Sequence, residues 1–159
     1  MGDRIFLGKS FDHIMMEYSD MGTRICILNL RNSQDAKDCF QNVFIKLYQS
    51  ENQFQDDQHL KAWLIRVAIN ECKNYRKRFY KQTIDIDNVI ISQHQEEILL
   101  LPEVLKLPFR YRNILYLYYY EGYKINEISI MLHMNENTVK SHLKRGRDLL
   151  RKKVGEFYE

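Results

Sequence analysis

The sequence predicts an all-α protein with two small helical domains joined by a flexible acidic linker. Two prolines and six glycines in 159 residues leave long runs of helix-forming residues. Apolar residues recur at helical spacing in several stretches, and an acidic segment from about residue 81 to residue 96 separates two basic clusters. We expect the first domain to span residues 1–80, the linker residues 81–95 and the second domain residues 96–159.

The first domain begins with two predicted helices. In residues 9–30 apolar and aromatic side chains recur at near-helical spacing, although Gly22 weakens the prediction for the later part. Ser33 is a candidate N-cap for the second helix, with Asp35 in its first turn. The expected apolar positions of the two helices are Phe11, Ile14, Met15, Tyr18, Ala36, Phe40, Val43, Phe44 and Leu47. The opposite side of the second helix carries Asp38, Gln41, Asn42 and Lys46.

A third helix is predicted from about Gln58 to Tyr80. Its expected packing face consists of Leu60, Trp63, Leu64 and Val67. Trp63 could instead offer a stacking surface, but a lone tryptophan on an apolar helical face belongs more often to the core. The helix ends in a basic cluster of Lys73, Arg76, Lys77, Arg78 and Lys81.

The second domain opens with a segment rich in tyrosine. Four tyrosines lie next to Ile114, Leu115 and Leu117 in this segment: Tyr116, Tyr118, Tyr119 and Tyr120. Tyrosines in such a setting could stack on bases. Because they precede the helix pair and lie among apolar residues, we expect them to form domain core or a protein interface instead.

The segment from Lys124 to Lys153 predicts a helix-turn-helix. Its first helix carries an apolar face, a turn follows around His133, and Asn135 is a favoured N-cap for the second helix. His133 suits a turn that needs a positive φ, and Lys124 leaves the first helix only the Glu127 half of a capping box. The expected members of the motif are Ile125, Ile128, His133, Asn135, Thr138, Val139 and Leu143.

The second helix of this motif is strongly cationic. Seven Lys or Arg residues between Lys140 and Lys153 face one acid, Asp148. A cationic stripe is most often solvated surface, but on the second helix of a tight helix pair it favours entry into a DNA major groove. Gly146 lies within this helix and should cost about 1 kcal/mol of helix propensity.

Two blocks of the chain resemble the sigma factors of bacterial RNA polymerase. Leu107-Pro108-Phe109-Arg110-Tyr111-Arg112, Tyr119-Tyr120-Glu121-Gly122-Tyr123, Asn126-Glu127-Ile128 and the run from Asn135 to Ser141 resemble sigma region four, in the family's order and spacing. The run from Asp35 to Phe44, the run from His59 to Asn70 and the basic Asn74-Tyr75-Arg76-Lys77-Arg78 resemble region two. The chain is similar to the minimal extracytoplasmic-function (ECF) group.

The resemblance implies three sets of contacts, each of which could also be plain solvated helix surface. Binding of the upstream promoter element is implied for Lys140, Ser141, Lys144 and Arg145, with Arg145 the best candidate for a bidentate guanine contact. Promoter melting and binding of the downstream element are implied for Asn70, Asn74, Arg76, Lys77 and Arg78, the two asparagines as a base pocket and the cations on phosphates. Docking on polymerase is implied for Asp35, Asp38, Gln41, Asn42 and Phe44, although Asn42 stands where relatives often carry an acid.

The resemblance also implies partners and a function. The expected partners are core RNA polymerase, through the clamp coiled coil of its largest subunit and its flap, promoter DNA and an anti-sigma factor. The expected function is promoter recognition and melting in transcription initiation. The alternative is an autonomous helix-turn-helix regulator that binds a duplex operator without polymerase. The linker could cross the polymerase near the RNA exit path or serve as an inert tether.

Several other classes lack support in the sequence. No carboxylate cluster, Ser or Tyr nucleophile motif or phosphate loop favours an enzyme, and we expect no cofactor. The three cysteines, Cys26, Cys39 and Cys72, have no disulfide or zinc spacing, the five histidines form no ligand pattern, and we expect no metal. The chain opens without a signal peptide and holds no membrane-length apolar run, so we expect a cytoplasmic protein without membrane insertion.

Overall fold

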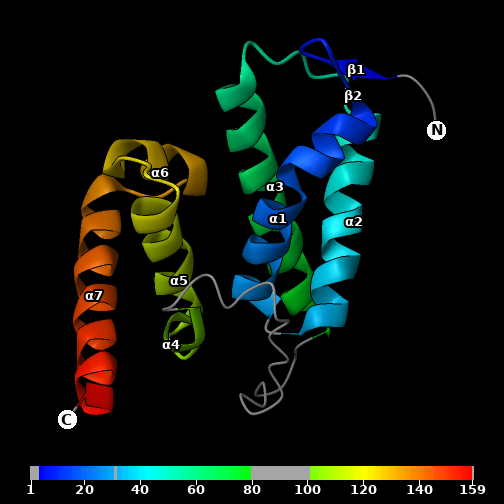
Figure 1. Ribbon diagram of the computed structural model, residues 1–159. Helices are drawn as coiled ribbons and strands as arrows, with labels where there is room; N and C mark the ends of the chain where they lie inside the picture. The colour runs from blue at the N-terminus through cyan, green and yellow to red at the C-terminus, as the bar shows by residue number, and fades with distance from the viewer. Residues whose placement is uncertain (1–3, 31, 80–100, 159) are drawn as a thin grey trace. The chain divides into compact units, whose positions relative to one another are not determined.

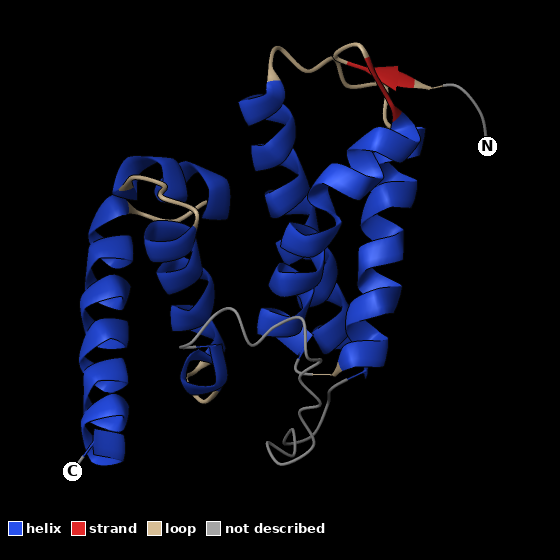
Figure 2. Ribbon diagram, in the orientation of Figure 1, coloured by secondary structure: helices blue, strands red, loops and turns tan. Residues whose placement is uncertain are grey.

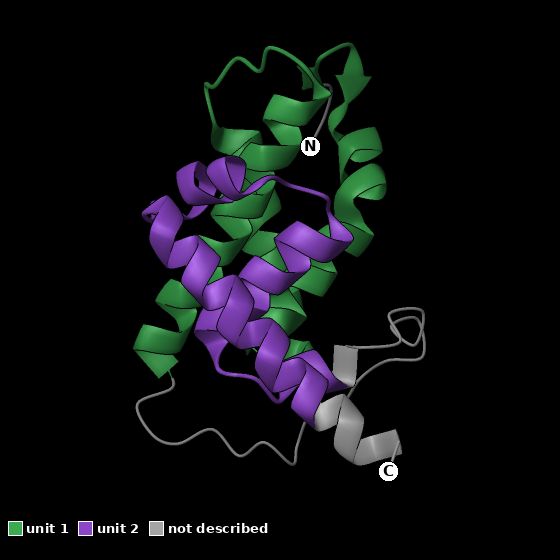
Figure 3. Cartoon of the chain, turned by 90° about the vertical axis from the view of Figure 1, so that its left-hand side faces the viewer, with its two compact units in different colours: residues 1–90 green, residues 91–159 purple. Residues whose placement is uncertain are grey.

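A computed structural model describes residues 4–30, 32–79 and 101–158 as two compact units. The first unit comprises residues 1–90 and the second residues 91–159 (Figure 3). The described residues are helical apart from one short hairpin and the connecting loops, which confirms the predicted all-α class (Figure 2). The predicted linker, residues 81–95, lies outside the described residues.

The first unit is a three-helix bundle. Helix α1 (Phe11–Leu30) packs against both α2 (Ser33–Gln49) and α3 (Asp57–Phe79), which also pack on each other (Figure 1). Helix α1 continues through Gly22, where a Cβ atom would lie 2.9 Å from the Phe40 ring. Glycine at this position therefore permits the close approach of α1 and α2.

Two details of the bundle differ from the prediction. The N-cap of α2 is Asn32, whose side chain accepts hydrogen bonds from the amides of Gln34 and Asp35, so the prediction of Ser33 was wrong by one residue. Trp63 and Val67 are half-buried, and the fully buried face of α3 is rotated relative to the predicted one. That face consists of Leu60, Leu64, Ile65, Ala68 and Cys72.

A β-hairpin that the sequence analysis missed precedes α1. Strands β1 (Ile5–Phe6) and β2 (Lys9–Ser10) pair in antiparallel register, Phe6 opposite Lys9. Leu7 (φ 54°) and Gly8 (φ 77°) both have positive φ, the pattern of a type I′ turn. Two-residue strands are too short to show an alternation of apolar and polar residues, so no sequence period signalled them.

The three cysteines lie in the core of this bundle, one on each helix, with free thiols. The hydrogen bond with Cys72, together with burial, raises the pKa of the Cys39 thiol, and the hydrogen bond with Cys26 raises the pKa of Cys72. Raised thiol pKa values suppress the reactive thiolate. The cysteines therefore behave as small core residues, as predicted.

The second unit is built around its last helix. Helices α4 (Leu101–Leu105) and α5 (Phe109–Leu115) lead into a π-helical turn, η3 (Tyr116–Tyr120), then α6 (Ile125–Leu132) and α7 (Glu136–Tyr158). Helix α7 packs on α4, α5 and α6. A Cβ atom on Gly146 would lie 3.1–3.3 Å from Leu115 and Tyr111, so alanine there would crowd the contact between α5 and α7 while it raised helix propensity.

The predicted helix-turn-helix is confirmed in its local geometry. His133 has φ 53° and ψ 46°, the left-handed conformation that ends α6. The Asn135 side chain accepts from the amide of Asn137, and Glu127 accepts from the amide of Lys124. Val139 and Leu143 of α7 and Ile128 of α6 are buried, which holds the two helices at a fixed angle.

Two features are absent from the part of the chain that the structure describes. No helix there combines the length and the apolar character needed to cross a membrane. Residues 4–30, 32–79 and 101–158 also contain no group of three His, Cys, Asp or Glu side chains arranged to hold a metal ion.

Candidate nucleic-acid interfaces

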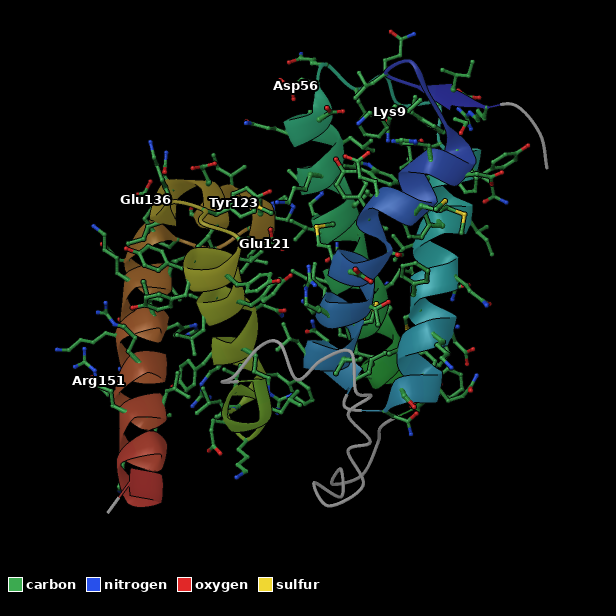
Figure 4. All side chains as sticks on the ribbon, in the orientation of Figure 1. Lys9, Asp56, Glu121, Tyr123, Glu136 and Arg151 are labelled. Atoms are coloured by element: carbon green, nitrogen blue, oxygen red, sulfur yellow. The ribbon has the colours of Figure 1, made fainter. Side chains whose placement is uncertain are left out.

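Helix α7 separates a buried face from an exposed cationic one. Val139, Leu143 and Gly146 are buried against the rest of the second unit. The predicted DNA residues on the other side, Lys140, Ser141, Lys144 and Arg145, are all exposed. In Figure 4 Glu136 marks the first turn of this helix and Arg151 its later part. The helix therefore offers a surface that a polyanion can reach without unfolding.

Arg145 of α7 and Arg110 of α5 both influence the side chain of Tyr111. The Arg110 guanidinium lies over the Tyr111 ring, 4.8 Å from its centroid, and its interaction with the Tyr111 side chain, followed by that of Arg145, lowers the pKa of Tyr111. The Tyr111 ring also meets the His142 ring edge-on at 5.5 Å. Burial, followed by the charges of Arg110 and Arg145, lowers the pKa of His142. At neutral pH the cluster thus contains two guanidinium ions beside a neutral imidazole.

The tyrosine cluster is divided between core and surface. Tyr116 is buried, and its hydroxyl donates to the Glu121 carboxylate at 2.6 Å. Tyr119 and Tyr120 are 56% and 47% exposed, and Arg147 donates to the Tyr119 hydroxyl at 3.2 Å. The prediction that these tyrosines belong to the core is confirmed for Tyr116. The rings of Tyr119 and Tyr120 are exposed, and a protein interface at these rings stays a prediction.

Helix α3 presents amides and cations on one exposed face. Asn70 and Asn74, one turn apart, are exposed, as are Lys77 and Arg78. Arg76 differs from its predicted role, because it is half-buried and donates from Nη1 to the Asn29 carbonyl at 3.3 Å. Arg76 thus ties the end of α3 to the end of α1 and does not belong to the free cationic face.

Trp63 occupies the same side of α3 as the two asparagines. Seven residues on, Asn70 falls about 20° short of two full turns, and Asn74 falls about 20° beyond three, at about 100° per residue. The indole is half-buried, and the Phe54 ring contacts it edge-on at 5.6 Å. The rotation of the buried face of α3 brings Trp63 out of the predicted core and to the margin of the exposed face.

The exposed face of α2 is polar with one apolar residue. Asp38, Gln41 and Asn42 are exposed as predicted, but Phe44 is only 3% exposed and packs at 4.8 Å from the Phe40 ring. Its prediction as a surface contact was wrong, because it lies with Val43 and Leu47 on the core side. The apolar residue on the exposed face is Ile45, 48% exposed, which follows Asp38 by seven residues. The missed signal was this i, i+3, i+4, i+7 spacing.

Asp35 is engaged inside the bundle. Its Oδ1 accepts a hydrogen bond of 2.7 Å from the Tyr75 hydroxyl of α3. This bond, ahead of burial, raises the pKa of Tyr75 to about 12. Together with the bond from Arg76 to Asn29, it anchors the end of α3 to the other two helices.

Comparisons with protein-family models give two matches in one chain. Residues 15–81 match the model "Sigma-70 region 2", and residues 97–150 match the model "Sigma-70, region 4". The first match covers most of the bundle from α1 to α3. The second covers α5, η3, α6 and most of α7.

Named proteins of similar sequence cover nearly the whole chain. The chain is 26% identical to the ECF RNA polymerase sigma factor SigW of Bacillus subtilis, over 91% of this chain and 89% of SigW. It is 26% identical to SigM of Mycobacterium tuberculosis, over 97% of this chain and 80% of that protein. It is also 26% identical to the sigma-E factor of Escherichia coli, over 92% and 87% of the two chains.

Solved structures support the fold. The sigma factor RpoE of Bartonella quintana, in complex with the anti-sigma factor NepR, aligns with a TM-score of 0.74 at 20% identity, over 91% of this chain and 96% of that one. The protein CnrH, in complex with the cytosolic domain of CnrY, aligns with a TM-score of 0.66 at 19% identity, over 92% and 88%.

Proposed function

Because the chain belongs to the sigma-70 family of RNA polymerase sigma factors, in its ECF group, we propose that it binds core polymerase and directs promoter recognition and melting. The observation that carries this proposal is the presence of regions 2 and 4, in that order, on two separate compact units. Sigma factors of this family are initiation factors and not enzymes. We assign the domains to residues 1–80 and 96–159, with residues 81–95 as the linker.

We assign recognition of the upstream promoter element to α7. Its exposed Lys140, Ser141, Lys144 and Arg145 combine phosphate-binding cations with groups that can reach base edges in the major groove. The helix-turn-helix presents this face because the left-handed His133 turns the chain between α6 and α7.

We assign strand opening to α3. Asn70 and Asn74 offer amide donors and acceptors to the edges of unpaired bases, and Lys77 and Arg78 offer charge to the displaced backbone. Trp63, at the margin of the same face, can stack on an unpaired base. Arg76 is left out of this set because it is bonded to Asn29.

We assign docking on polymerase to the exposed face of α2. Asp38, Gln41 and Asn42 surround the exposed Ile45, which takes the place first given to Phe44. A double replacement of Asp38 and Gln41 by alanine should abolish capture of core polymerase, and Ile45→Ala should weaken it. Lys37→Ala, an exposed change on the same helix, is the matched control. Undiminished capture by the double variant would refute this assignment.

The named structural relatives are complexes with anti-sigma factors or with the cytosolic domain of a partner protein. We propose by analogy that an anti-sigma factor holds this chain inactive, and that the chain acts in the cytoplasm, where polymerase and promoter DNA lie.

Transcription in vitro with core polymerase, with and without this protein, on a genomic promoter library tests the proposed function. We expect specific initiation from a limited set of promoters only when the protein is present. Duplex binding in the absence of polymerase, without initiation in its presence, would instead indicate an autonomous helix-turn-helix regulator.

A further inference from the structure

The N-terminal hairpin lies outside the matched region 2, which begins at residue 15. Its turn places Leu7 at φ 54°, a conformation that disfavours residues with a Cβ atom. Such a conformation persists only where the surrounding structure enforces it. The hairpin contacts α2, the start of α1 and the loop before α3, and these contacts show which segments it holds together.

Arg4 joins the hairpin to the end of α2. Its Nη1 donates to the Tyr48 carbonyl and its Nη2 to the Ser50 carbonyl, at the C-terminus of α2. Carbonyls at a helix C-terminus lack partners within the helix, and a cation there also suits the helix dipole. The Arg4 carbonyl in turn accepts from the Phe11 amide at 2.9 Å, which ties the same residue to the start of α1.

Phe6 joins the hairpin to the loop between α2 and α3. Phe6 is 6% exposed, and its ring lies 6.3 Å from that of Phe54 in this loop. Phe54 in turn contacts the Trp63 ring at 5.6 Å and the His59 ring at 5.4 Å. A continuous chain of aromatic contacts thus runs from the hairpin to Trp63.

The start of α3 receives two further restraints. Lys9 of β2 forms an ion pair with Asp57 at 3.5 Å. The Asp56 carboxylate accepts from the His59 amide at 2.7 Å, as an N-cap does, and His59 Nδ1 accepts from the Gln55 amide at 3.1 Å. Figure 4 labels Lys9 on the hairpin and Asp56 directly before α3.

We propose that the N-terminal hairpin is a positioning element for strand opening, in which Arg4 and Phe6 fix the loop of residues 50–56 so that Phe54 holds Trp63 in place to stack on an unpaired base. The inference rests on the proposed function of α3. Arg4 and Phe6 act through Phe54 and do not touch the DNA.

Trp63 is the sole tryptophan of the chain, so intrinsic fluorescence reports on the position of this side chain. In the full-length protein, below its melting transition, Phe6→Ala should shift the emission to longer wavelength and raise the acrylamide quenching constant about twofold, because the indole loses support on one side. Arg4→Ala should produce a smaller change in the same direction. Ile5→Ala is the matched control, since Ile5 lies in the same strand but is 67% exposed.

Promoter opening by the holoenzyme is the second measurement, followed by permanganate reactivity of unpaired thymines. Phe6→Ala should lower opening roughly tenfold, on the scale of one lost base-stacking contact. Capture of core polymerase and duplex binding by α7 should stay within about twofold of the parent, because Phe6 belongs to neither of the surfaces assigned to these two contacts. Phe6→Leu keeps the apolar volume and should restore most of the opening.

The outcomes separate the two proposals. Unchanged Trp63 fluorescence in both Phe6→Ala and Arg4→Ala would overturn the positioning role, as would altered fluorescence with normal opening. If Phe6→Ala fails to fold, the same two measurements on folded Arg4→Ala and Phe6→Leu proteins decide between these outcomes. Failure of the parent protein to open any promoter would refute the function proposed for α3, while the fluorescence of the variants would still report on the hairpin.

Discussion

Helices α3 and α7 are alike in length and differ in what they expose. Each has 23 residues, buries one face and carries several Lys and Arg residues. Helix α7 presents cations directly after a tight turn, whereas α3 presents asparagines, with its cations gathered at the far end. Cations bind the phosphate backbone of an intact duplex, and amides can form hydrogen bonds with the exposed edges of unpaired bases. This difference favours duplex binding by α7 and strand opening by α3.

The two helices also differ in how they are anchored. The end of α3 is bonded to α1 through Arg76 and to α2 through Tyr75, so its exposed face is fixed relative to the docking face of α2. Helix α7 is held mainly through apolar packing and through Gly146 against α5. A helix that must hold unpaired bases needs the firmer support, because misplacement of a binding group weakens its contacts.

The largest effect is expected from removal of the α7 cations. The triple variant Lys140→Ala, Lys144→Ala, Arg145→Ala should lose about 3–4 kcal/mol of duplex affinity, roughly a hundredfold to a thousandfold, and should flatten the dependence of affinity on salt. The measurement is a titration of duplex promoter DNA at several salt concentrations. Arg151→Ala, an exposed change later on the same helix, is the control. Equal loss in that control would show that only bulk charge matters.

Arg145 alone separates base recognition from phosphate binding. Arg145→Ala should weaken one promoter class by roughly 1–3 kcal/mol at a single base position. The loss should be measured on promoters mutated one base at a time. A loss that is the same on every sequence would show that Arg145 contacts only phosphate. Tyr111 would then help to position Arg145 against the DNA backbone.

The α3 asparagines should show the reverse pattern. Asn70→Ala combined with Asn74→Ala should reduce promoter opening by about tenfold, the value of one or two hydrogen bonds, and leave duplex affinity unchanged. Gln58→Ala removes an exposed amide from the first turn of the same helix and is the control. Loss of duplex affinity with normal opening would place these residues with α7 in function and would abolish the distinction between the two helices.

Sequence periodicity predicted most of the helices but fewer of the residues exposed at the candidate sites. The helix-turn-helix, the Asn135 cap and the left-handed His133 follow from local chemistry, so the sequence predicted them. The hairpin and the rotated face of α3 depend on contacts between distant segments, which leave no local period. Phe44 and Ile45 are adjacent apolar residues, and only the packing against α1 decides which one is buried. Arg76 looked like a free cation because its acceptor, Asn29, lies 47 residues away.

The anchor of α3 should contribute measurably to stability. Tyr75→Phe removes the hydrogen bond to Asp35 and should lower the free energy of unfolding by about 1 kcal/mol at neutral pH. Because the pKa of Tyr75 is raised to about 12 in the folded state, this stabilisation is complete below the ordinary tyrosine pKa near 10. It should be lost as pH rises from about 10 through 12. Urea unfolding of the parent and variant across this range measures it, and an identical pH dependence in the two proteins would contradict the assignment.

The smallest effect is expected at His142, which lies on α7. Burial and two neighbouring guanidinium groups lower its pKa in the folded state, so the unfolded chain takes up a proton first as the pH falls below the ordinary histidine value of about 6.5. The second unit should therefore lose some stability through this window, from about 6.5 down to the lowered pKa. His142→Gln should remove that dependence, whereas replacement of the exposed His133 leaves it. Promoter DNA should reduce this loss of stability, because phosphates beside Arg110 and Arg145 offset the charges that disfavour protonation of His142. If the stability of the parent protein has the same pH dependence with and without duplex DNA, the phosphates bind away from this cluster.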